Sequence, residues 1–155
     1  MGWAQEPEHE RTLIHIEHAN QLHKKAGLDA VVLKGEVHIR HDSTHFYCDS
    51  AYYYEDRNSF DAFQHVHIQV NDSIDMYSRT MLYDGDRRFA EFFDDVRMMD
   101  DSTLLVTQYM TYDRDRHLAC YPHHGVTTRG DKKLVSEIGY YRDDLNELRF
   151  SSQWR

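Results

Sequence analysis

Apolar and polar residues alternate along much of the chain with a period of two. Val37 and Ile39 are separated and flanked by polar residues, and Val66, Ile68 and Val70 repeat the same arrangement about thirty positions later. Such alternation is typical of strands that bury one face and expose the other. The abundance of valine, isoleucine, threonine, tyrosine and phenylalanine in these segments also favours strands.

Short polar segments separate the alternating stretches and are predicted to be tight turns. They cover residues 55–58, 84–86, 113–115 and 142–144, and Asp84-Gly85 is the strongest hairpin signal among them. Residues 13–25 fit neither the helical nor the strand period cleanly, and we interpret them as an entry strand followed by a turn.

The strand pattern belongs to an internal repeat of 29–30 residues. Three interleaved rows of residues recur at this spacing. The rows are Val37, Val66, Val96 and a degenerate fourth member, Val126; Tyr54, Tyr83, Tyr112 and Tyr141; and Ala62, Ala90, Ala119 and Leu148. Three rows over four copies are hard to obtain by chance, so the repeat indicates stacked units that share one apolar interior.

Two all-β architectures satisfy this pattern. One is a β-jellyroll in which two sheet layers fold over each other like a taco shell, and the alternative is a right-handed β-helix. We expect one domain over residues 13–150, a flexible entry segment or added expression residues at 1–12, and a tail at 151–155. The ends of either stack are open strand edges, which favour pairing with another copy.

Composition excludes several classes of function. The chain has 155 residues, a net charge of −9 and a mean hydropathy of −0.80. It therefore lacks the basic excess that nucleic-acid binding requires, and it has no apolar run of the roughly 20 residues that span a membrane as a helix. The two cysteines, Cys48 and Cys120, fall at different places in their repeat units, which slightly favours free thiols.

Candidate chemistry is sparse. His65 and His67 share a strand and could bind zinc together with His38, but no accompanying ligand motif is present, and surface histidines are the favoured interpretation. The basic pairs Arg87-Arg88 and Lys132-Lys133 are interpreted as solvated turn charges. The acidic turns lack calcium-loop spacing, and no carboxylate pair stands apart from the repeat. We therefore expect no enzymatic activity and no cofactor.

The residues of the repeat resemble a known family. The segments 29–37, 47–52, 58–63 and 82–85 (Asp-Ala-Val-Val-Leu-Lys-Gly-Glu-Val, Tyr-Cys-Asp-Ser-Ala-Tyr, Asn-Ser-Phe-Asp-Ala-Phe and Leu-Tyr-Asp-Gly) are similar to the OstA-like family of lipopolysaccharide-transport proteins. This family includes LptA, the periplasmic domain of LptC and the N-terminal domain of LptD. The glycine that the family places before the valine row is kept at Gly35 and Gly125, while His65 and Asp95 depart from it.

The resemblance implies a β-jellyroll in the periplasm, with a signal peptide already removed, that holds the acyl chains of lipopolysaccharide in its interior. It also implies end-to-end stacking with other OstA-like domains, of the same or another chain. The residues expected on the inner, lipid-binding face are Val37, Ile39, Tyr54, Val66, Ile68, Met81, Tyr83, Val96, Met98, Met110 and Tyr112.

Three hypotheses follow. The first is a non-enzymatic lipid-carrying module whose interior opens as a groove. The second is a β-solenoid protein that binds or modifies carbohydrates, with Tyr47, Tyr53 and Tyr109 on an outward face. The third is a structural module that polymerises through its strand edges around a closed core.

Overall fold

A computed structural model describes residues 11–24, 26–27, 29–145 and 147–151, and within them the chain forms thirteen strands and one short 3-10 turn. The predicted entry segment at 1–12 lies outside the described residues except for Arg11 and Thr12, and the predicted tail lies outside them except for Ser151. The elements are β1 (His15–His18), β2 (Gln21–Lys24), β3 (Val31–His41), β4 (Thr44–Tyr54), η1 (Glu55–Arg57), β5 (Ser59–Val70), β6 (Ile74–Asp84), β7 (Phe89–Asp100), β8 (Thr103–Asp113), β9 (Leu118–Tyr121), β10 (Gly125–Arg129), β11 (Lys132–Ser136), β12 (Ile138–Arg142) and β13 (Glu147–Ser151).

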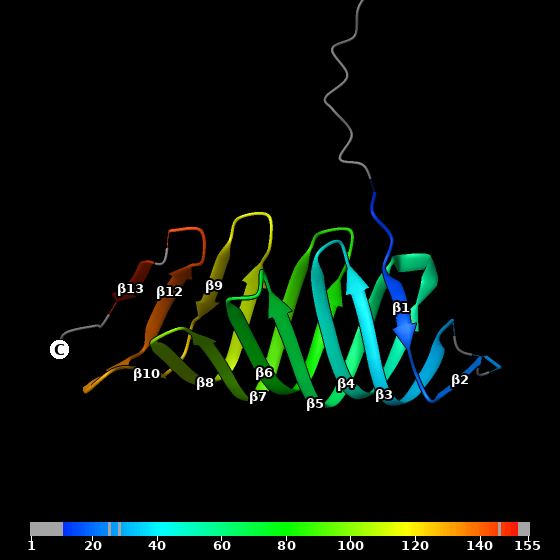
Figure 1. The fold of residues 1–155 in the computed structure, drawn as a ribbon, viewed down its shortest axis with the longest axis horizontal. Helices are drawn as coiled ribbons and strands as arrows, with labels where there is room; N and C mark the ends of the chain where they lie inside the picture. Colours follow the sequence, from blue (N-terminus) through cyan, green and yellow to red (C-terminus); the bar gives the residue numbers. More distant parts are fainter. Residues whose placement is uncertain (1–10, 25, 28, 146, 152–155) are drawn as a thin grey trace, which may run out of the picture.

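All strand pairs in the sheet are antiparallel, and from β3 to β9 each strand pairs with the next one along the chain. At the start, β1 and β2 pair with the two halves of β3, and at the other end β9 and β10 share β8. The molecule is therefore an elongated meander, with β1 and β2 at one end and β10 to β13 at the other (Figure 1).

Each long strand bends in its middle, where the ladder register shifts by a bulge. On β3, β5 and β7 the bend consists of two consecutive residues with positive φ: Gly35 and Glu36, Gln64 and His65, and Asp94 and Asp95. Bulges kink and twist a strand, so each strand passes from one layer of the sheet to the other. Figure 1 shows the strands curving round along the lower edge. His65 and Asp95, which stand where the family has glycine, therefore still form the tight bend.

The bends fold the sheet into two layers with the apolar residues between them. Inward residues alternate with outward ones on every long strand, and their side chains form one continuous buried cluster. This is the taco-shaped β-jellyroll expected from the repeat. A β-helix is not formed, because its coils stack strands in parallel whereas this sheet is antiparallel throughout the described residues.

One member of the predicted tyrosine row, Tyr54, is out of register with the others. Tyr54 lies on the outer face, where its hydroxyl donates to Asp61 and the Arg57 guanidinium covers its ring. Tyr53 instead packs against the core. The inward position of β4 lies 30 residues before Tyr83, not 29, and a shift of one residue moves a side chain to the opposite face. The predictions of an inward Tyr54 and an outward Tyr53 are therefore both wrong.

The fourth copy of the valine row is also displaced. Val126 faces outward, while its neighbours Gly125 and Thr127 take the buried positions opposite Thr107 and Leu105. The break between β9 and β10 changes the register there, because no continuous strand carries the alternation through. Both cysteines are free, as expected, with Cys48 buried and Cys120 half-buried.

Candidate functional site

The apolar interior is the candidate site, and it contains ten of the eleven residues predicted to line it. Each of the ten is at most 2% exposed. They are Val37, Ile39, Val66, Ile68, Met81, Tyr83, Val96, Met98, Met110 and Tyr112. Their positions follow from the repeat, because equivalent strands place equivalent residues in a ladder along the length of the molecule.

Large flexible and aromatic side chains fill the space between the layers. Met76, Met81 and Met110 are completely buried, and Phe60 and Phe92 are buried with them. Methionine side chains have several rotatable bonds and adapt to irregular neighbours. The interior is thus packed in this structure, and its four buried methionines, Met76, Met81, Met98 and Met110, can change shape at low cost.

The layers meet in different ways along the two long sides of the molecule. On one side they are joined by the bent strands. On the other, two rows of turns face each other, and we call this line the mouth. One row contains the turns at 42–43, 71–73 and 101–102, and the other contains those at 55–58, 85–88 and 114–117. The turns lie along the upper side of the molecule in Figure 1.

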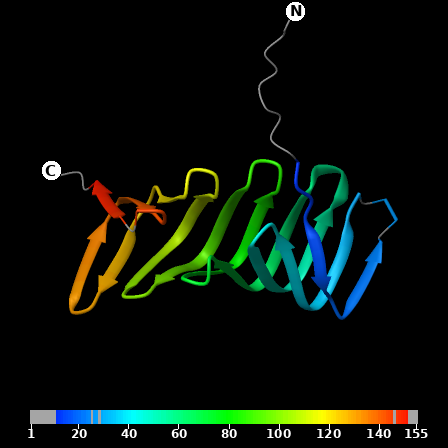
Figure 2. The same ribbon diagram turned by 45° about the horizontal axis from the view of Figure 1, so that its top comes forward.

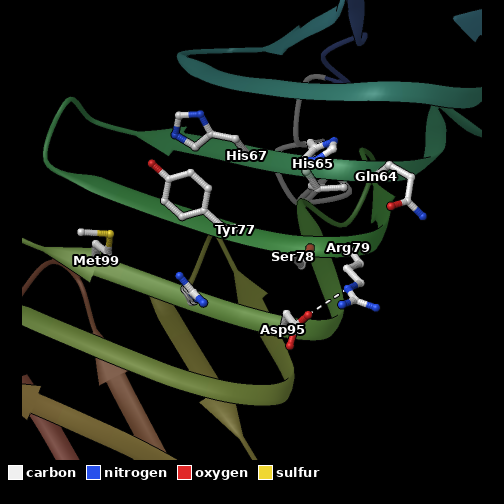
Figure 3. Close-up of a pocket in the computed structure, with 10 residues that line it drawn as sticks. Gln64, His65, His67, Tyr77, Ser78, Arg79, Asp95 and Met99 are labelled. Carbon is white, nitrogen blue, oxygen red and sulfur yellow. Dashed lines mark ion pairs between the residues drawn. The ribbon is translucent and has the colours of Figure 1, made fainter. Parts of the chain in front are cut away.

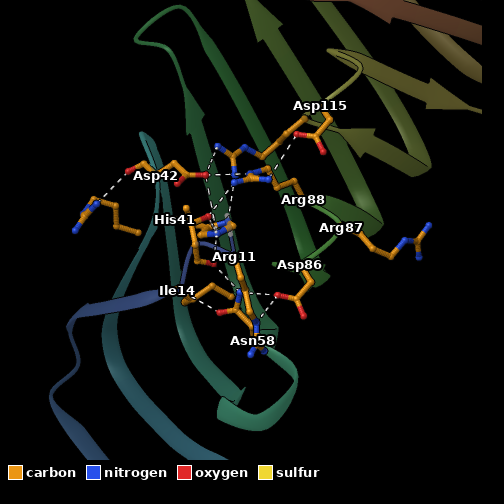
Figure 4. Close-up of polar contacts among 12 residues, drawn as sticks. Arg11, Ile14, His41, Asp42, Asn58, Asp86, Arg87, Arg88 and Asp115 are labelled. Carbon is orange, nitrogen blue, oxygen red and sulfur yellow. Dashed lines mark hydrogen bonds and ion pairs between the residues drawn. The ribbon is translucent and has the colours of Figure 1, made fainter. Parts of the chain in front are cut away.

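An ion-pair network crosses the mouth near β3 (Figure 4). Asp42, in one row of turns, accepts a hydrogen bond from Arg88 Nε at 3.1 Å and lies 3.5 Å from Arg114 Nη2, both from the other row. Burial is the largest single influence on Asp42 and acts to raise its pKa, but the hydrogen bonds from Arg88 and Thr12 and the positive charge of Arg114 together outweigh it, and the pKa is lowered. Arg88 is only 19% exposed, so the prediction that it is a solvated turn charge is wrong.

His41 lies completely buried beneath this network. The Thr12 carbonyl lies 2.9 Å from His41 Nε2 and can only accept a hydrogen bond, so Nε2 carries the proton. Nδ1 is then the acceptor for the Tyr83 hydroxyl at 2.6 Å, while the Tyr83 oxygen accepts a hydrogen bond from Arg114 Nη1. Burial lowers the pKa of His41, so the imidazole is neutral. Burial also raises the pKa of Tyr83 to about 12.

Residues 11–14 lie across this end of the mouth. Asn58 accepts a hydrogen bond from the backbone N–H of Ile14 at 2.9 Å and donates to the Thr12 carbonyl at 2.8 Å. Arg11 pairs with Asp86 at 2.9 Å, and the side chain of Ile14 enters the buried cluster. The N-terminal segment therefore closes the mouth here, as Figure 4 shows.

Two tyrosine–carboxylate hydrogen bonds lie further along the mouth. Tyr141, at the end of β12, donates to Asp100 in the opposite layer, and Tyr112 donates to Asp143. Burial, together with these hydrogen bonds to carboxylates, raises the pKa of both tyrosines. Both phenols therefore stay protonated and act as donors.

The sequence analysis missed this closure of the mouth. Its residues lie in or beside turns, where polar residues are ordinary. One signal was present: His41 has the same parity as Val37 and Ile39, so a polar side chain occupies an inward position. A buried histidine must find hydrogen-bond partners, and this requirement points to a network.

The outer face carries a second feature, a hollow of about 720 Å³ beside the bend. Figure 3 shows His67 and Tyr77 on one side of it and an ion pair between Arg79 and Asp95 on another. His67 stacks on Tyr77 with ring centroids 4.5 Å apart, and its Nε2 lies 2.7 Å from Asp75.

His38, His65 and His67, the histidines of the zinc-site hypothesis, are not arranged as a metal site. His65 bonds to Asp49 and His67 to Asp75, while His38 bonds to His45. In the part of the chain that the structure describes, no group of three or more histidine, cysteine or acidic side chains is arranged to hold a metal ion.

A family model described as OstA-like protein matches residues 11–154. The chain belongs to the OstA-like family. The match confirms the family predicted from the repeat, a family of lipopolysaccharide-transport proteins, and it extends over the whole meander.

The solved structure of LptH from Pseudomonas aeruginosa also resembles this chain. It is described as the LptA-homologous periplasmic component of the conserved lipopolysaccharide transport device. The two share 10% sequence identity with a TM-score of 0.37, and the alignment covers 90% of this chain and 82% of LptH. No curated protein matches the sequence. Among the described residues, no helix is long and apolar enough to cross a membrane.

Proposed function

We propose that this OstA-like protein is a non-enzymatic module of periplasmic lipopolysaccharide transport that holds lipid acyl chains between its two sheet layers. The ten buried residues of the predicted rows form the wall of that site. The proposal includes association with other OstA-like domains through the open edges at β1 and β2 and at β11 and β13.

The observation that carries the proposal is the continuity of the apolar interior along the family's repeat. Buried apolar side chains run from Ile14 near the first strand to Tyr141 near the last. Each acyl CH₂ group that leaves water gains roughly 0.8 kcal/mol, so a few chains of ordinary length supply ample driving force. Polar chemistry inside the site is not required.

The way the mouth closes also supports the proposal. Within the described residues, the hydrogen bonds and ion pairs that cross the mouth all involve a side chain, and no strand ladder crosses it. Side chains rearrange without unfolding the sheet. The layers can therefore separate along the mouth while the bends hold them together, which gives an acyl chain a route to the interior.

A binding experiment with two adjacent substitutions tests the proposal. Val66→Glu places a carboxylate in the interior, while His67→Glu places the same group on the outer face of the same strand. We expect the wild type and His67→Glu to retain lipopolysaccharide in native mass spectrometry and Val66→Glu to lose it. Equal retention by both variants would contradict a lipid site in the interior.

Val66→Glu can also fail by unfolding, since a buried charge is costly. Val66→Phe is the second variant, because it keeps the interior apolar while it fills space. Circular dichroism selects the variants that fold. A folded Val66→Phe that binds less lipopolysaccharide than His67→Glu supports the proposal, and one that binds as much as wild type contradicts it.

The saccharide-binding alternative is not favoured by the outward tyrosines. Tyr47 stands between His38 and His67, with ring centroids at 4.6 and 5.6 Å, so neighbouring rings occupy both of its faces. Tyr109 packs against Phe93 and donates to Glu91. A sugar stacks on a free ring face, which Tyr47 does not offer, and Phe93 and Glu91 already engage the ring and the hydroxyl of Tyr109.

A further inference from the structure

The two layers separate at the C-terminal end of the molecule. The first half of β8 pairs with β10 and its last residues pair with β9, so β8 is the last strand that belongs to both layers. Beyond it, β10 pairs with β11 in one layer, while β9 continues to β12 and β13 in the other. Figures 1 and 2 show the β10–β11 hairpin and the β12–β13 pair diverging.

A hollow of about 610 Å³ lies between the diverging pairs. Leu134 of β11 and Leu148 and Phe150 of β13 form its apolar wall. Leu134 is 45% exposed although it lies on a strand, because β11 has no further neighbour to cover it. The end of the interior is thus continued by an apolar surface that water reaches.

Three cationic residues lie around the same hollow, at the tip of the β10–β11 hairpin: Arg129, Lys132 and Lys133. Arg129 and Lys132 are paired in the strand ladder and share a face with Leu134, while Lys133 alternates to the other face of β11 at the rim. In the described part of the chain, neither lysine has a carboxylate partner, and Arg129 uses its Nε on the Thr103 hydroxyl at 2.7 Å. The chain has a net charge of −9, so it has more carboxylates than cations. A cluster of three cations on such an acidic chain makes a local positive patch.

A buried polar atom lies at the edge of the hollow. Thr127 lines the hollow and is buried, and its Oγ1 has no hydrogen-bond partner. Buried hydroxyl groups normally find a partner, and leaving one unpaired costs about 1–3 kcal/mol. The hollow therefore has an unpaired hydroxyl group at its edge.

We propose that this hollow binds a phosphate-bearing acyl lipid, with the phosphate on Arg129 and Lys132, Lys133 adding positive charge at the rim, and the start of the chain against Leu134, Leu148 and Phe150. Guanidinium and ammonium groups are the usual partners of phosphate, and the apolar wall matches the alkyl part of the same molecule. This inference rests on the proposed function and deepens it, because it gives the anionic end of the lipid a place at the C-terminal end of the interior.

Dodecyl phosphate is the probe, and isothermal titration below its critical micelle concentration is the measurement. Lys132→Glu/Lys133→Glu is compared with Lys24→Glu/Lys34→Glu, which changes the net charge equally on exposed residues at the other end. We expect the first double variant to bind dodecyl phosphate at least about tenfold more weakly, since two attractive charges become repulsive. The control double variant should bind like wild type.

Other probes separate the two parts of the site. Dodecyl maltoside has the same chain without the phosphate, and inorganic phosphate has no chain; both should bind more weakly than dodecyl phosphate. Equal binding of dodecyl phosphate by both double variants would overturn the proposal. A loss of self-association in Lys132→Glu/Lys133→Glu without any change in dodecyl phosphate binding would also overturn it, and would identify the hollow as a docking surface for a second copy.

A negative result for the end hollow can be distinguished from a failure of the proposed function, because different variants test the two sites. The interior site is tested by Val66→Glu and Val66→Phe with lipopolysaccharide, and the end hollow by the lysine variants with dodecyl phosphate. If the Val66 variants lose lipopolysaccharide while the lysine variants bind dodecyl phosphate normally, the interior site stands and the end hollow does not.

Discussion

The two ends of the interior are built from the same repeat but closed in different ways. At the N-terminal end, Ile14 enters the core and Asn58, His41 and Asp42 satisfy the polar groups around it. At the C-terminal end the layers diverge, and the buried positions are taken by Tyr121 and by small polar residues such as Thr127. The N-terminal end is closed by a connected network, and the C-terminal end by the Tyr121 ring and the hydrogen bond from Tyr141 to Asp100.

The difference shows that the terminal units of a repeat protein need their own way to cover the apolar interior. Each internal unit is covered by its neighbours, but the first and last units have one neighbour fewer. Residues 11–14 replace the missing neighbour at the N-terminal end. At the C-terminal end the hollow beside Leu134 leaves the corresponding surface open. We therefore expect substitutions at the N-terminal end to reduce the stability of the protein most. We expect the C-terminal end to form new contacts with a ligand or a second chain most readily.

The largest effect should come from Asn58→Ala. Asn58 is completely buried and has a φ of 47°, and its amide group bonds to Ile14, Thr12 and Asp86. Alanine leaves the Ile14 N–H and the Thr12 carbonyl without these partners and disfavours a positive φ, so unfolding in urea should require about 3 kcal/mol less. Asn58→Gly is the control: it relieves the backbone strain, and a full recovery of stability would show that the hydrogen bonds contribute nothing.

Gly139→Ala should weaken the other end. A Cβ atom on Gly139 would lie 2.1 Å from the Tyr121 ring, which Gly125 of β10 approaches from the other layer. The ring must move, and overpacking of this kind costs about 1–3 kcal/mol. Hydrogen exchange should increase in β12 and β13 and stay unchanged in β3 and β4. An equal increase of hydrogen exchange in β3 and β4 would show that the two ends are not independent.

Acid should loosen the N-terminal end through His41. Its folded pKa is lowered by burial, so below pH 6.5 the unfolded chain takes up a proton that the folded chain excludes. The stabilisation is complete above that pH and is lost as the pH falls toward the folded pKa, at a rate of at most about 1.4 kcal/mol per pH unit.

His41→Gln removes this titration and is compared with wild type in urea titrations at several pH values. His38, whose pKa is also lowered by partial burial, contributes in the same direction in both proteins and cancels. The stability difference between the two proteins should shrink as the pH falls. A constant difference would show that His41 does not titrate in this range.

The smallest effect should come from Thr127→Val. The substitution removes an unpaired buried hydroxyl and keeps the shape of the side chain, so we expect it to stabilise the protein by about 1 kcal/mol. Thr103→Val is the matched control, because the Thr103 hydroxyl accepts a hydrogen bond from Arg129 and its loss should destabilise. Destabilisation by Thr127→Val would show that the hydroxyl has a partner in solution.

The fold and most of the interior could be predicted from the sequence because they depend on a period of two repeated at a fixed spacing. The valine row at Val37, Val66 and Val96 is buried as expected. The errors lie where the spacing changes by one residue, at Tyr54 beside η1 and at Val126 after the break between β9 and β10. A single-residue change of register leaves composition unaltered and reverses the face, so a row read at constant spacing cannot reveal it.

The closure of the mouth could not be predicted in the same way. Asp42, Arg88 and Arg114 come from three turns that are 46 and 26 residues apart along the chain, and their meeting depends on how the layers fold over each other. Turn residues carry no periodic signal. Lys132 and Lys133 likewise read as ordinary turn charges until the diverging layers place Leu134, Leu148 and Phe150 beside them.

Nuclear magnetic resonance of methionine methyl groups tests the central claim most directly. Met98 and Met99 are adjacent on β7, with Met98 in the interior and Met99 47% exposed on the outer face. Protein labelled at the methionine methyls is mixed with lipopolysaccharide, and nuclear Overhauser effects from acyl-chain protons are recorded. We predict effects at Met81, Met98 and Met110 and none at Met99. A stable complex with effects confined to Met99 would contradict an acyl-chain site between the layers.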